Sequence, residues 1–519
     1  MESTVKRVLT TAKIIFSNGQ EYTIPMVNPN NPRNPDLQNY GTKCTLKQSL
    51  YKGTSTNVIG NICCSSLSIE GRSYDKLLIT SNTSSQYHNY MNNTAKVELK
   101  CTGDDNVETL MGVYYVDTWE CGTSSDDYES FYITCVDLLS KIKNISLKKV
   151  RLKQRMKFSE YLKIVIDKLN QNLSQDLRVK YSISTLEKMD NLYNTNWQMY
   201  YNNIDMENIE TIFNTLAQNT LSYVWIDRNN YLQVDSLIDD NQSETVCTLS
   251  GLDNLFSYDI QQGDIGNYSG LSVEYISAIS YKDVQLLQLQ DYELYVGKNN
   301  ITGQLNTDKA IKINLIEISC DDGTKAVCTG FFNYKNEIDM VIKSQTNTTA
   351  TITVYGQVID ETYNTKTVYK NNSNRSNVLE IQNYLLRAED IDTYVDNFLR
   401  LISMENSSMS AEGYINPQLK LSDMVAVVGT RLSISNYYKV VDLEFTLGTN
   451  YRCRVGLMKT IESQVSIQAI LGSDNEFVLG MLGGDTVDTT YDFLSPTPSQ
   501  ETQIQNYIGT QLTELQAFL

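Results

Sequence analysis

The sequence predicts a mainly β, multidomain protein with α+β insertions and a C-terminal helix. Its 519 residues correspond to three or four domains, at roughly 100–200 residues per domain. Tyrosine is abundant, with 35 residues, and enrichment in Tyr and Thr together with many Asn-containing turns favours strands over helices. Hydrophobic residues make up 41% of the chain, which is ample core material for globular domains.

Residues 1–145 have the pattern of a first β domain. The strands predicted at 12–16 (AKIIF) and 21–25 (EYTIP) flank Asn18-Gly19, a dipeptide suited to a type I′ hairpin turn. A short helix at 137–143 (DLLSKIK) is expected to begin after Asp137 as its N-cap. Further strands are expected at 74–80, 96–101, 110–117 and 129–136.

Residues 146–250 change to an α+β pattern. A helix is predicted at 158–173, with Ser159 as its N-cap, because apolar residues there recur at helical spacing. A second helix at 205–219, with Asp205 as its N-cap, leads into strands at 222–226 and 230–234. The order helix, then hairpin, indicates a small α+β domain.

Residues 251–375 return to β patterns, and residues 376–460 combine a helix with strands. A linker or exposed loop is expected at 364–377, and helical text runs through 378–402 with a break near 388–390. A hairpin is expected around Gly448-Thr449-Asn450. The predicted strands are 271–276, 311–318, 337–342, 348–359, 424–428, 437–447 and 451–458.

The remaining residues, 461–519, are expected to form an extension that ends in a helix. Pro496 and Pro498 separate residues 500–519 from the β pattern before them. A helix of about 20 residues is marginal alone, so it needs a partner surface, either a neighbouring domain or copies of itself. Its apolar stripe is the candidate assembly segment, made of Ile504, Ile508, Leu512, Leu515 and Leu519.

Charge and composition restrict the possible functions. The formal net charge is -18, which disfavours tight binding of nucleic acid, although such a chain could surround nucleic acid without holding it, or use the charge for solubility alone. No apolar run of about 18 residues predicts a membrane helix, and the N-terminus does not resemble a signal peptide. The 10 cysteines include no Cys-x-x-Cys pair, so reduced thiols are expected rather than a zinc site.

Motifs for catalysis, cofactors and metals were not found. The single histidine, His88, lies in polar text and is expected to be exposed to solvent. Phosphate-binding glycine loops and calcium loops do not occur, and a pair of carboxylates remains the one catalytic arrangement that the sequence leaves open. We therefore expect no enzyme activity, no cofactor and no metal. Solvated turns are the expected setting of the acidic pairs Asp104-Asp105, Asp126-Asp127, Asp239-Asp240 and Asp321-Asp322.

Three stretches resemble phage tail hub proteins, in the order that the family shows. Residues 110–139 (LMGVYYVDTWECGTSSDDYESFYITCVDLL) resemble the end of the first hub domain, and residues 205–234 resemble the intervening domain. Residues 379–459 resemble the second hub domain. There Pro417, Leu419 and Asp423 match the family's P-x-L-x-x-G-D text, with Ser422 in place of the glycine.

This resemblance implies two β-barrel-like tube domains per chain. In the family, three subunits form a pseudo-sixfold ring that joins the tail tube to a tip or spike, and the short-tail knob proteins are related. The expected partners are therefore two further copies of the chain, the tail tube protein, a tip or spike protein, other baseplate proteins, and genomic DNA in transit. The implied location is the virion tail, after synthesis in the host cytoplasm, and an excess of acidic residues is expected on the surface facing the axis.

Another class of function stays open, namely a receptor- or carbohydrate-binding tail adhesin. Trp119, Trp197 and Trp225 could stack on sugars, although core packing is the more ordinary role for a tryptophan beside a predicted strand. A tail-associated lysin would need a catalytic motif, which was not found.

Overall fold

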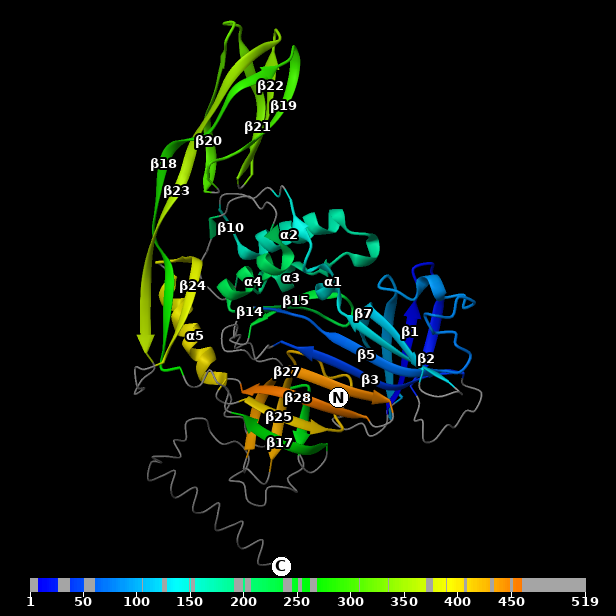
Figure 1. Cartoon of the computed structure of the whole chain (residues 1–519). Coiled ribbons are helices and arrows are strands. Elements are labelled where there is room, and N and C mark those ends of the chain that lie inside the picture. Colours follow the sequence, from blue (N-terminus) through cyan, green and yellow to red (C-terminus); the bar gives the residue numbers. More distant parts are fainter. Residues whose placement is uncertain are drawn as a thin grey trace, which may run out of the picture.

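Two β-barrel-like domains lie side by side in the computed structural model, with an α+β part packed on them and a long β arm that projects away (Figure 1). The structure describes residues 8–26, 38–50, 61–104, 106–123, 128–148, 150, 155–190, 199–200, 207–236, 245–250, 254–261, 268–307, 309–334, 336–369, 377–388, 390–405, 408–429, 434–448 and 451–459.

The first barrel is formed by N-terminal strands in the order β3-β5-β8-β7-β6-β1-β2. An isolated parallel bridge between Met26 and Gly41 brings the chain after β2 back to β3. The approach is close, because a Cβ on Gly41 would lie 2.2 Å from Met26 Sδ and the end of the Met26 side chain would have to move. The strands are β1 (Val8–Ile15), β2 (Glu21–Pro25), β3 (Asn39–Ser49), β5 (Ser66–Ser73), β6 (Lys96–Gly103), β7 (Glu108–Thr123) and β8 (Glu129–Val136).

The first hairpin forms where Asn18-Gly19 predicts it, between β1 and β2. Gly19 has φ +82°, whereas Asn18 does not adopt a positive φ. A type I′ turn requires positive φ at both central residues, so the predicted turn type is wrong although the hairpin is right.

The α+β part follows the first barrel and packs on it. Its four-stranded sheet has the order β11-β15-β14-β4, in which β4 (Ile62–Cys63) comes from the N-terminal region. The short strands β10 (Arg155–Met156) and β12 (Met199–Tyr200) pair with each other. The other elements are α1 (Leu138–Ile142), β9 (Ser146–Leu147), α2 (Phe158–Asn172), β11 (Lys180–Tyr181), α3 (Ile183–Glu187), β13 (Glu207–Asn208), α4 (Ile209–Thr220), β14 (Ser222–Ile226) and β15 (Tyr231–Ser236).

The second barrel contains the C-terminal strands and two strands from the middle of the chain. Its order is β17-β25-β28-β27, and β26 pairs with both β27 and β16. The strands are β16 (Cys247–Ser250), β17 (Leu255–Gln261), β25 (Ser408–Gly413), β26 (Met424–Gly429), β27 (Ile434–Gly448) and β28 (Arg452–Lys459), and α5 (Ile391–Glu405) precedes β25.

The arm is an insertion between β17 and α5. Its shaft is the antiparallel pair β18 (Gly270–Leu294) and β23 (Thr348–Tyr369), flanked by β20 (Ala310–Cys320) and β24 (Val378–Arg387). Its outer part adds β19 (Gly297–Gln304), β21 (Ala326–Asn333) and β22 (Glu337–Ser344). The sequence predicts domain boundaries near residues 250 and 375. In the structure, β16 and β17 lie on either side of the first boundary but both belong to the second barrel, and β24 follows the second boundary but belongs to the arm.

The hydrophobic core has two separate parts. One continuous cluster extends through both barrels and the α+β part, and it includes Phe131, Phe213 and Phe445. The arm has its own cluster, which includes Leu286, Ile338 and Ile352. The two barrels, the α+β part and the base of the arm therefore form one packed body, because Leu271 and Val273 of β18 belong to the first cluster. Only the outer part of the arm is stabilised by a core of its own.

The largest error of the sequence prediction concerns residues 378–402. The segment divides near residues 388–390 as expected, but its first part is the strand β24 and only its second part is the helix α5. β24 pairs in parallel with β18, for instance Leu271 with Leu379. This long-range pairing overrides the local helical periodicity. The expected loop at 364–377 also begins too early, since residues up to Tyr369 belong to β23.

Two predicted helix starts and one predicted strand are also wrong. Ser159 does not cap α2, since Lys157 is at the N-cap and Ser159 bonds to Asp190 instead. α4 begins at Ile209 with Asn208 as its cap, because Glu207 and Asn208 first pair with β9. Asp205 lies outside the described residues. Residues 74–80 form turns rather than a strand.

Neither the C-terminal helix nor its apolar stripe is tested, since residues 460–519 lie outside the described part of the chain. Within the described residues, no helix is both long enough and apolar enough to cross a membrane.

Asp137 caps α1 as the sequence predicts, and it also ties the helix to the first barrel. Its carboxylate accepts hydrogen bonds from the backbone N–H of Ser140 at 2.8 Å and of Ser65 at 2.5 Å. Burial raises the pKa of Asp137 to about 6, against the opposing effect of these hydrogen bonds. Between about pH 4 and pH 6 the Asp137 carboxyl group is therefore mainly protonated in the folded protein, whereas it is mainly ionised in the unfolded chain.

We predict that the advantage of wild type over Asp137→Asn decreases as the pH rises from about 4 to about 6. The folded pKa of Asp137 lies above its unfolded value, so its contribution to stability is lost as the pH rises through the folded pKa. The measurement is the difference in thermal unfolding midpoint between the two proteins at several pH values. Asp321→Asn, at an exposed position on the arm, is the control, and a difference for Asp137→Asn that is constant with pH would contradict the prediction.

Candidate functional site

The two barrels share a single continuous sheet. β3 and β27 pair in antiparallel fashion from Lys43 opposite Gly448 to Ser49 opposite Asp442. Figure 1 shows β3 and β5 beside β27 and β28. We call this the junction sheet, and it comprises β17, β25, β28, β27, β3, β5, β8 and the distal half of β7, residues 116–123.

One face of the junction sheet is apolar and the other is polar. Successive side chains on a strand point to opposite faces, and the burial along β3, β5, β8 and β27 alternates accordingly. Leu46, Ile69, Ile133 and Phe445 are buried on the apolar face. The polar face is therefore the side on which the sheet meets solvent or a partner.

A row of hydroxyl side chains crosses the polar face from one barrel to the other. The register places Thr446 opposite Thr45, Thr45 opposite Ser68, and Ser68 opposite Thr134. Thr134 in turn lies opposite Thr118, and their hydroxyl oxygens are 2.5 Å apart. Five neighbouring strands thus present a band of neutral hydrogen-bonding groups.

Charged side chains flank this row on both sides, and most of the cations have carboxylate partners on the next strand. The Nζ–Oε distances are 3.8 Å for Lys43–Glu70 and 3.2 Å for Lys47–Glu444. Arg452 Nη1 lies 3.2 Å from Glu412 Oε1. Arg454 donates to Ser410 Oγ from its position opposite Glu444.

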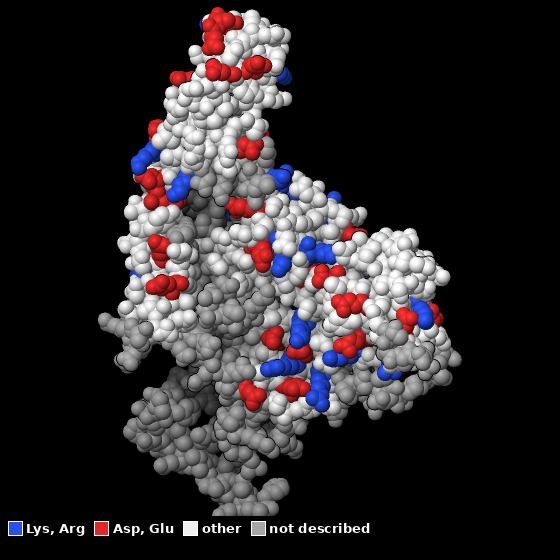
Figure 2. All heavy atoms as spheres, viewed as in Figure 1, with Lys and Arg blue, Asp and Glu red and all other residues white. Residues whose placement is uncertain are grey.

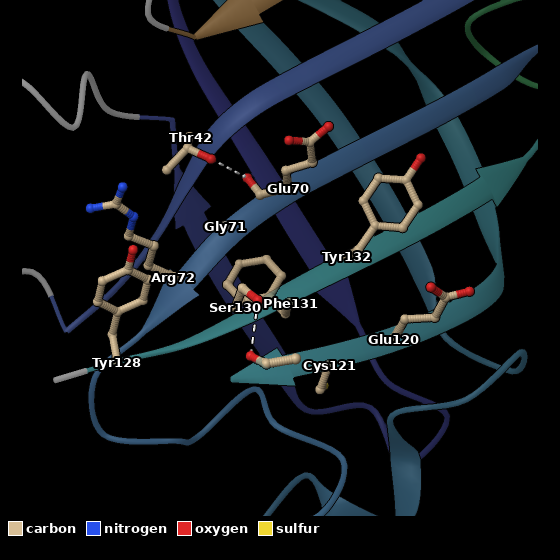
Figure 3. A pocket seen from close by; sticks show the side chains of 11 residues that line it. Thr42, Glu70, Gly71, Arg72, Glu120, Cys121, Tyr128, Ser130, Phe131 and Tyr132 are labelled. Carbon is tan, nitrogen blue, oxygen red and sulfur yellow. Dashed lines mark hydrogen bonds between the residues drawn. The ribbon is translucent and has the colours of Figure 1, made fainter. Parts of the chain in front are cut away.

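A shallow pocket of about 410 Å³ opens on the polar face at the first barrel (Figure 3). It exists because the outward residues Ser130 and Gly122 are small, whereas Tyr128 and Tyr132 stand on either side of them. The Arg72 guanidinium lies 4.5 Å from the centre of the Tyr128 ring. The pocket is also lined by Glu70, Glu120 and Cys121, and no histidine is among its lining residues.

The junction sheet has two edges without a strand partner among the described residues. β17 pairs only with β25 on its inner side. β7 leaves β6 after Tyr115, so its distal half pairs only with β8. A sheet edge without a strand partner is a surface on which another strand can add.

Arg228 links the α+β part to the second barrel from inside the body. It belongs to the turn between β14 and β15, is 6% exposed, and donates from Nη1 to Pro417 O at 2.7 Å and from Nη2 to Leu419 O at 2.6 Å. Its guanidinium lies 5.9 Å from the centre of the Phe445 ring. Burial lowers the pKa of Arg228, and the nearby Tyr114 and Asp423 oppose this shift.

The three stretches that resemble hub proteins therefore meet at one buried point. Tyr114 comes from the first, Arg228 from the second and Pro417 from the third. The sequence did not single out Arg228, because an arginine in the text DRNN has the appearance of a solvated turn residue. A second tie lies nearby, since Lys439 Nζ of β27 is 2.8 Å from Asp235 Oδ2 of β15, with side chains only 10% and 11% exposed.

Ser422 has φ +71°, in the left-handed region that favours glycine. This is the position at which the resembling family has glycine. The turn around it is held by Ser422 N, which donates to Val440 O, and by Asp423 Oδ2, which accepts from Lys420 N at 2.8 Å. The hydrogen bonds of this turn compensate for the strain of a serine in that conformation.

His88 is half-buried, so the expected solvent exposure is wrong. It lies in a short 3-10 helix, His88–Tyr90, whose neighbours Tyr87 and Met91 are buried in the core. Its Nδ1 is buried, without a hydrogen-bond partner among the described residues.

The acidic pairs that the structure describes lie in turns, as expected. Asp322 accepts from Thr324 N at 2.9 Å and from Thr324 Oγ1, which lowers its pKa to about 2. Within the described residues, no group of three or more His, Cys, Asp or Glu side chains is arranged to hold a metal ion. Asp104 is in an exposed turn, whereas Asp105, Asp126-Asp127 and Asp239-Asp240 lie outside the described residues.

Two of the three tryptophans lie in or against the hydrophobic core. Trp225 is 8% exposed, and Trp119 packs against the core cluster and donates from Nε1 to Leu78 O. Trp197 lies outside the described residues.

Comparison with known proteins found structural likeness only. No family model matches the chain, and no curated protein matches it. A tail protein from Neisseria meningitidis is similar with a TM-score of 0.47 and 9% identity, over 87% of this chain and 96% of that one. The 43 kDa tail protein of prophage MuSo2 from Shewanella oneidensis has a TM-score of 0.43 and 9% identity, over 87% and 98%.

A prophage tail protein from Listeria monocytogenes is similar to a comparable degree, with a TM-score of 0.42 and 10% identity, over 89% of this chain and 98% of that one. At these values the likeness is one of coarse fold and carries no further conclusion.

We predict that Arg228→Met destabilises the protein by about 2–4 kcal/mol, because it leaves the buried carbonyls of Pro417 and Leu419 without their donors. Thermal unfolding should show a clearly lower midpoint. Arg452→Met is the matched control, since Arg452 is exposed and its ion pair contributes little. Equal effects of the two substitutions would refute the assigned role of Arg228.

We predict that Ser422→Gly stabilises the protein by up to about 1 kcal/mol, because glycine adopts the positive φ without strain. The same change at Ser68, in the middle of β5, should destabilise it by about 0.5–1 kcal/mol. Thermal unfolding of both variants tests the opposite signs, and a loss of stability in Ser422→Gly would show that the serine hydroxyl matters more than the backbone.

Proposed function

We propose that the chain is a non-enzymatic structural component of a phage-type tail, specifically the hub at its distal end. The observation that carries this proposal is the junction sheet, which joins two β-barrel-like domains within one chain. It ends in β17 and distal β7, whose outer edges have no strand partner in the part of the chain that the structure describes. The sequence resemblance to hub proteins, whose three stretches converge at Arg228, supports the same assignment.

Two different edges favour assembly into a closed ring. Pairing of β17 in one copy with distal β7 in the next is a heterologous contact, and such contacts generate rings when the rotation closes. Three copies, each with two barrels, would give the pseudo-sixfold ring that the resemblance implies. Pairing of this kind would also give both edges a strand partner.

The ring would join the tail tube protein on one side to a tip or spike protein on the other, beside other baseplate proteins. Genomic DNA would pass along its axis without specific binding, and the location would be the virion tail. The adhesin alternative has less support, because Trp119 and Trp225 are packed into the body instead of being presented to a ligand.

We predict that the purified chain forms a species with three times the mass of one copy, measured by light scattering or native mass spectrometry. An image of the particle should show threefold symmetry about its axis. A monomer, or a hexamer of this chain, would contradict the proposed ring.

We call the proposed contact between β17 of one copy and distal β7 of the next the seam. It is tested by mixing two populations of the protein, one with Asp259→Cys on β17 and one with Glu120→Cys on distal β7. These positions are near the middle of the two edges, on the same face of the sheet. Oxidation should link the two populations covalently if the edges meet between copies. Glu317→Cys on the arm, used in place of Asp259→Cys, should give only the background seen with the wild type. No link above that background would refute the seam.

A further inference from the structure

The charge of the chain is unevenly distributed between the junction sheet and the rest of the molecule. Figure 2 shows Lys and Arg interleaved with Asp and Glu where β3 and β27 lie in Figure 1, whereas Asp and Glu gather at the far end of the arm. The whole chain has 61 Asp and Glu against 43 Lys and Arg. The polar face of the junction sheet therefore departs from the acidic average of the chain.

Carboxylates and cations are nearly balanced on the described part of this face. The register assigns these outward positions, and the burial pattern agrees with it. The carboxylates are Glu70, Glu120, Asp259, Glu412, Asp442 and Glu444, and the cations are Lys43, Lys47, Arg72, Arg452 and Arg454.

The cations on this face are engaged by neighbours across the strands. Lys43, Lys47 and Arg452 are in the ion pairs with Glu70, Glu444 and Glu412 described above. Arg454 donates to Ser410, and Arg72 stacks on Tyr128. These pairs are exposed, so they add little to stability. The main effect of the three ion pairs is on the electrostatic potential of the face, because each carboxylate cancels one cation at short range.

The hydroxyl row fills the space between the charged rows. Its members are neutral and satisfy one another in part, as in the 2.5 Å contact between Thr118 and Thr134. A polyanion that approaches this face meets neutral hydroxyls and paired charges instead of a stripe of free cations. To bind a phosphate, Lys43, Lys47 or Arg452 would first have to leave its carboxylate. Arg454 would have to leave Ser410, and Arg72 would have to leave the Tyr128 ring.

We propose that the polar face of the junction sheet is a passage surface for duplex DNA, kept non-adhesive by cross-strand neutralisation of its own cations. This rests on the proposed function for the identity of the polyanion. The net charge of the chain led us to expect an acidic lining. In this proposal the lining instead has nearly equal numbers of acidic and basic side chains. A balanced face neither holds phosphates nor imposes a strongly repulsive field on DNA that must enter.

The decisive variant removes the three partner carboxylates and leaves every cation in place. Glu70→Gln, Glu412→Gln and Glu444→Gln together release Lys43, Arg452 and Lys47 for phosphate contacts. Glutamine keeps the length and polarity of the side chain, so the strands should still form. A thermal melt similar to that of the wild type confirms folding before binding is measured.

The probe is a fluorescently labelled DNA duplex of about 30 base pairs, followed by polarisation at several salt concentrations. We expect no saturable binding by the wild type at about 0.15 M salt. The triple variant should bind at least about tenfold more tightly. Its log K should fall with log salt with a slope near −2.7, because each released cation that meets a phosphate contributes about 0.9.

A matched control changes the net charge by the same amount elsewhere. Asp291→Asn, Glu317→Gln and Asp321→Asn alter exposed residues on the arm. This control should remain as inert toward DNA as the wild type. Equal binding by both triple variants would mean that net charge decides, and the proposal would fail. It would also fail if the wild type bound DNA with a steep salt dependence, or if the sheet variant did not bind.

The outcome is separable from that of the ring. A monomeric chain whose sheet variant alone acquires DNA binding would sustain the neutralised face and refute the hub ring. A trimer whose sheet variant does not bind DNA would sustain the hub ring and refute the neutralised face.

Discussion

The pairing of β3 with β27 is the constraint on which the rest of the structure depends. It joins residues 43–49 to residues 442–448, so the chain between them must leave the sheet and return to it. The entropic cost of closing so long a loop grows only slowly with length, and it is offset by one core that extends through both barrels. The α+β part and the arm are consequently insertions whose ends are fixed by the body. The outer part of the arm tolerates this arrangement because it packs around a core of its own, whereas the base of the arm packs on the body.

Arg228 shows how the body is held in one arrangement. A buried guanidinium is expensive to desolvate, and the carbonyls of Pro417 and Leu419 together with the Phe445 ring help to compensate for this cost. Apolar residues could fill the same volume, but they would not fix the distance between the β14–β15 turn and the Pro417 turn. The buried Lys439–Asp235 pair adds a second polar tie between the same parts. We infer that these contacts favour one relative placement of the α+β part and the second barrel over others.

The distribution of charge in this chain can be understood only from the strand pairing of the folded sheet. A net charge of -18 suggests repulsion of any polyanion, yet the paired strands place lysine and arginine beside glutamate from distant parts of the sequence. Lys47 and Glu444 are neutralised by each other only because β3 lies against β27. The same strand pairing that builds the sheet therefore sets its surface potential, and the acidic excess is left to other surfaces such as the arm.

The sequence by itself determined the mainly β class, the Asn18-Gly19 hairpin, the cap at Asp137 and the extent of α2, because each depends on residues close together in the chain. It failed where distant segments compete with local preference. Residues 378–387 have helical periodicity but become β24, since pairing with β18 satisfies their backbone. Arg228 resembled a solvated turn residue, and its burial required the Pro417 turn to lie over it. Only the tertiary structure decided which strands are neighbours, and with them the hydroxyl row and the ion pairs of the junction sheet, because cross-strand contacts depend on register rather than on sequence separation.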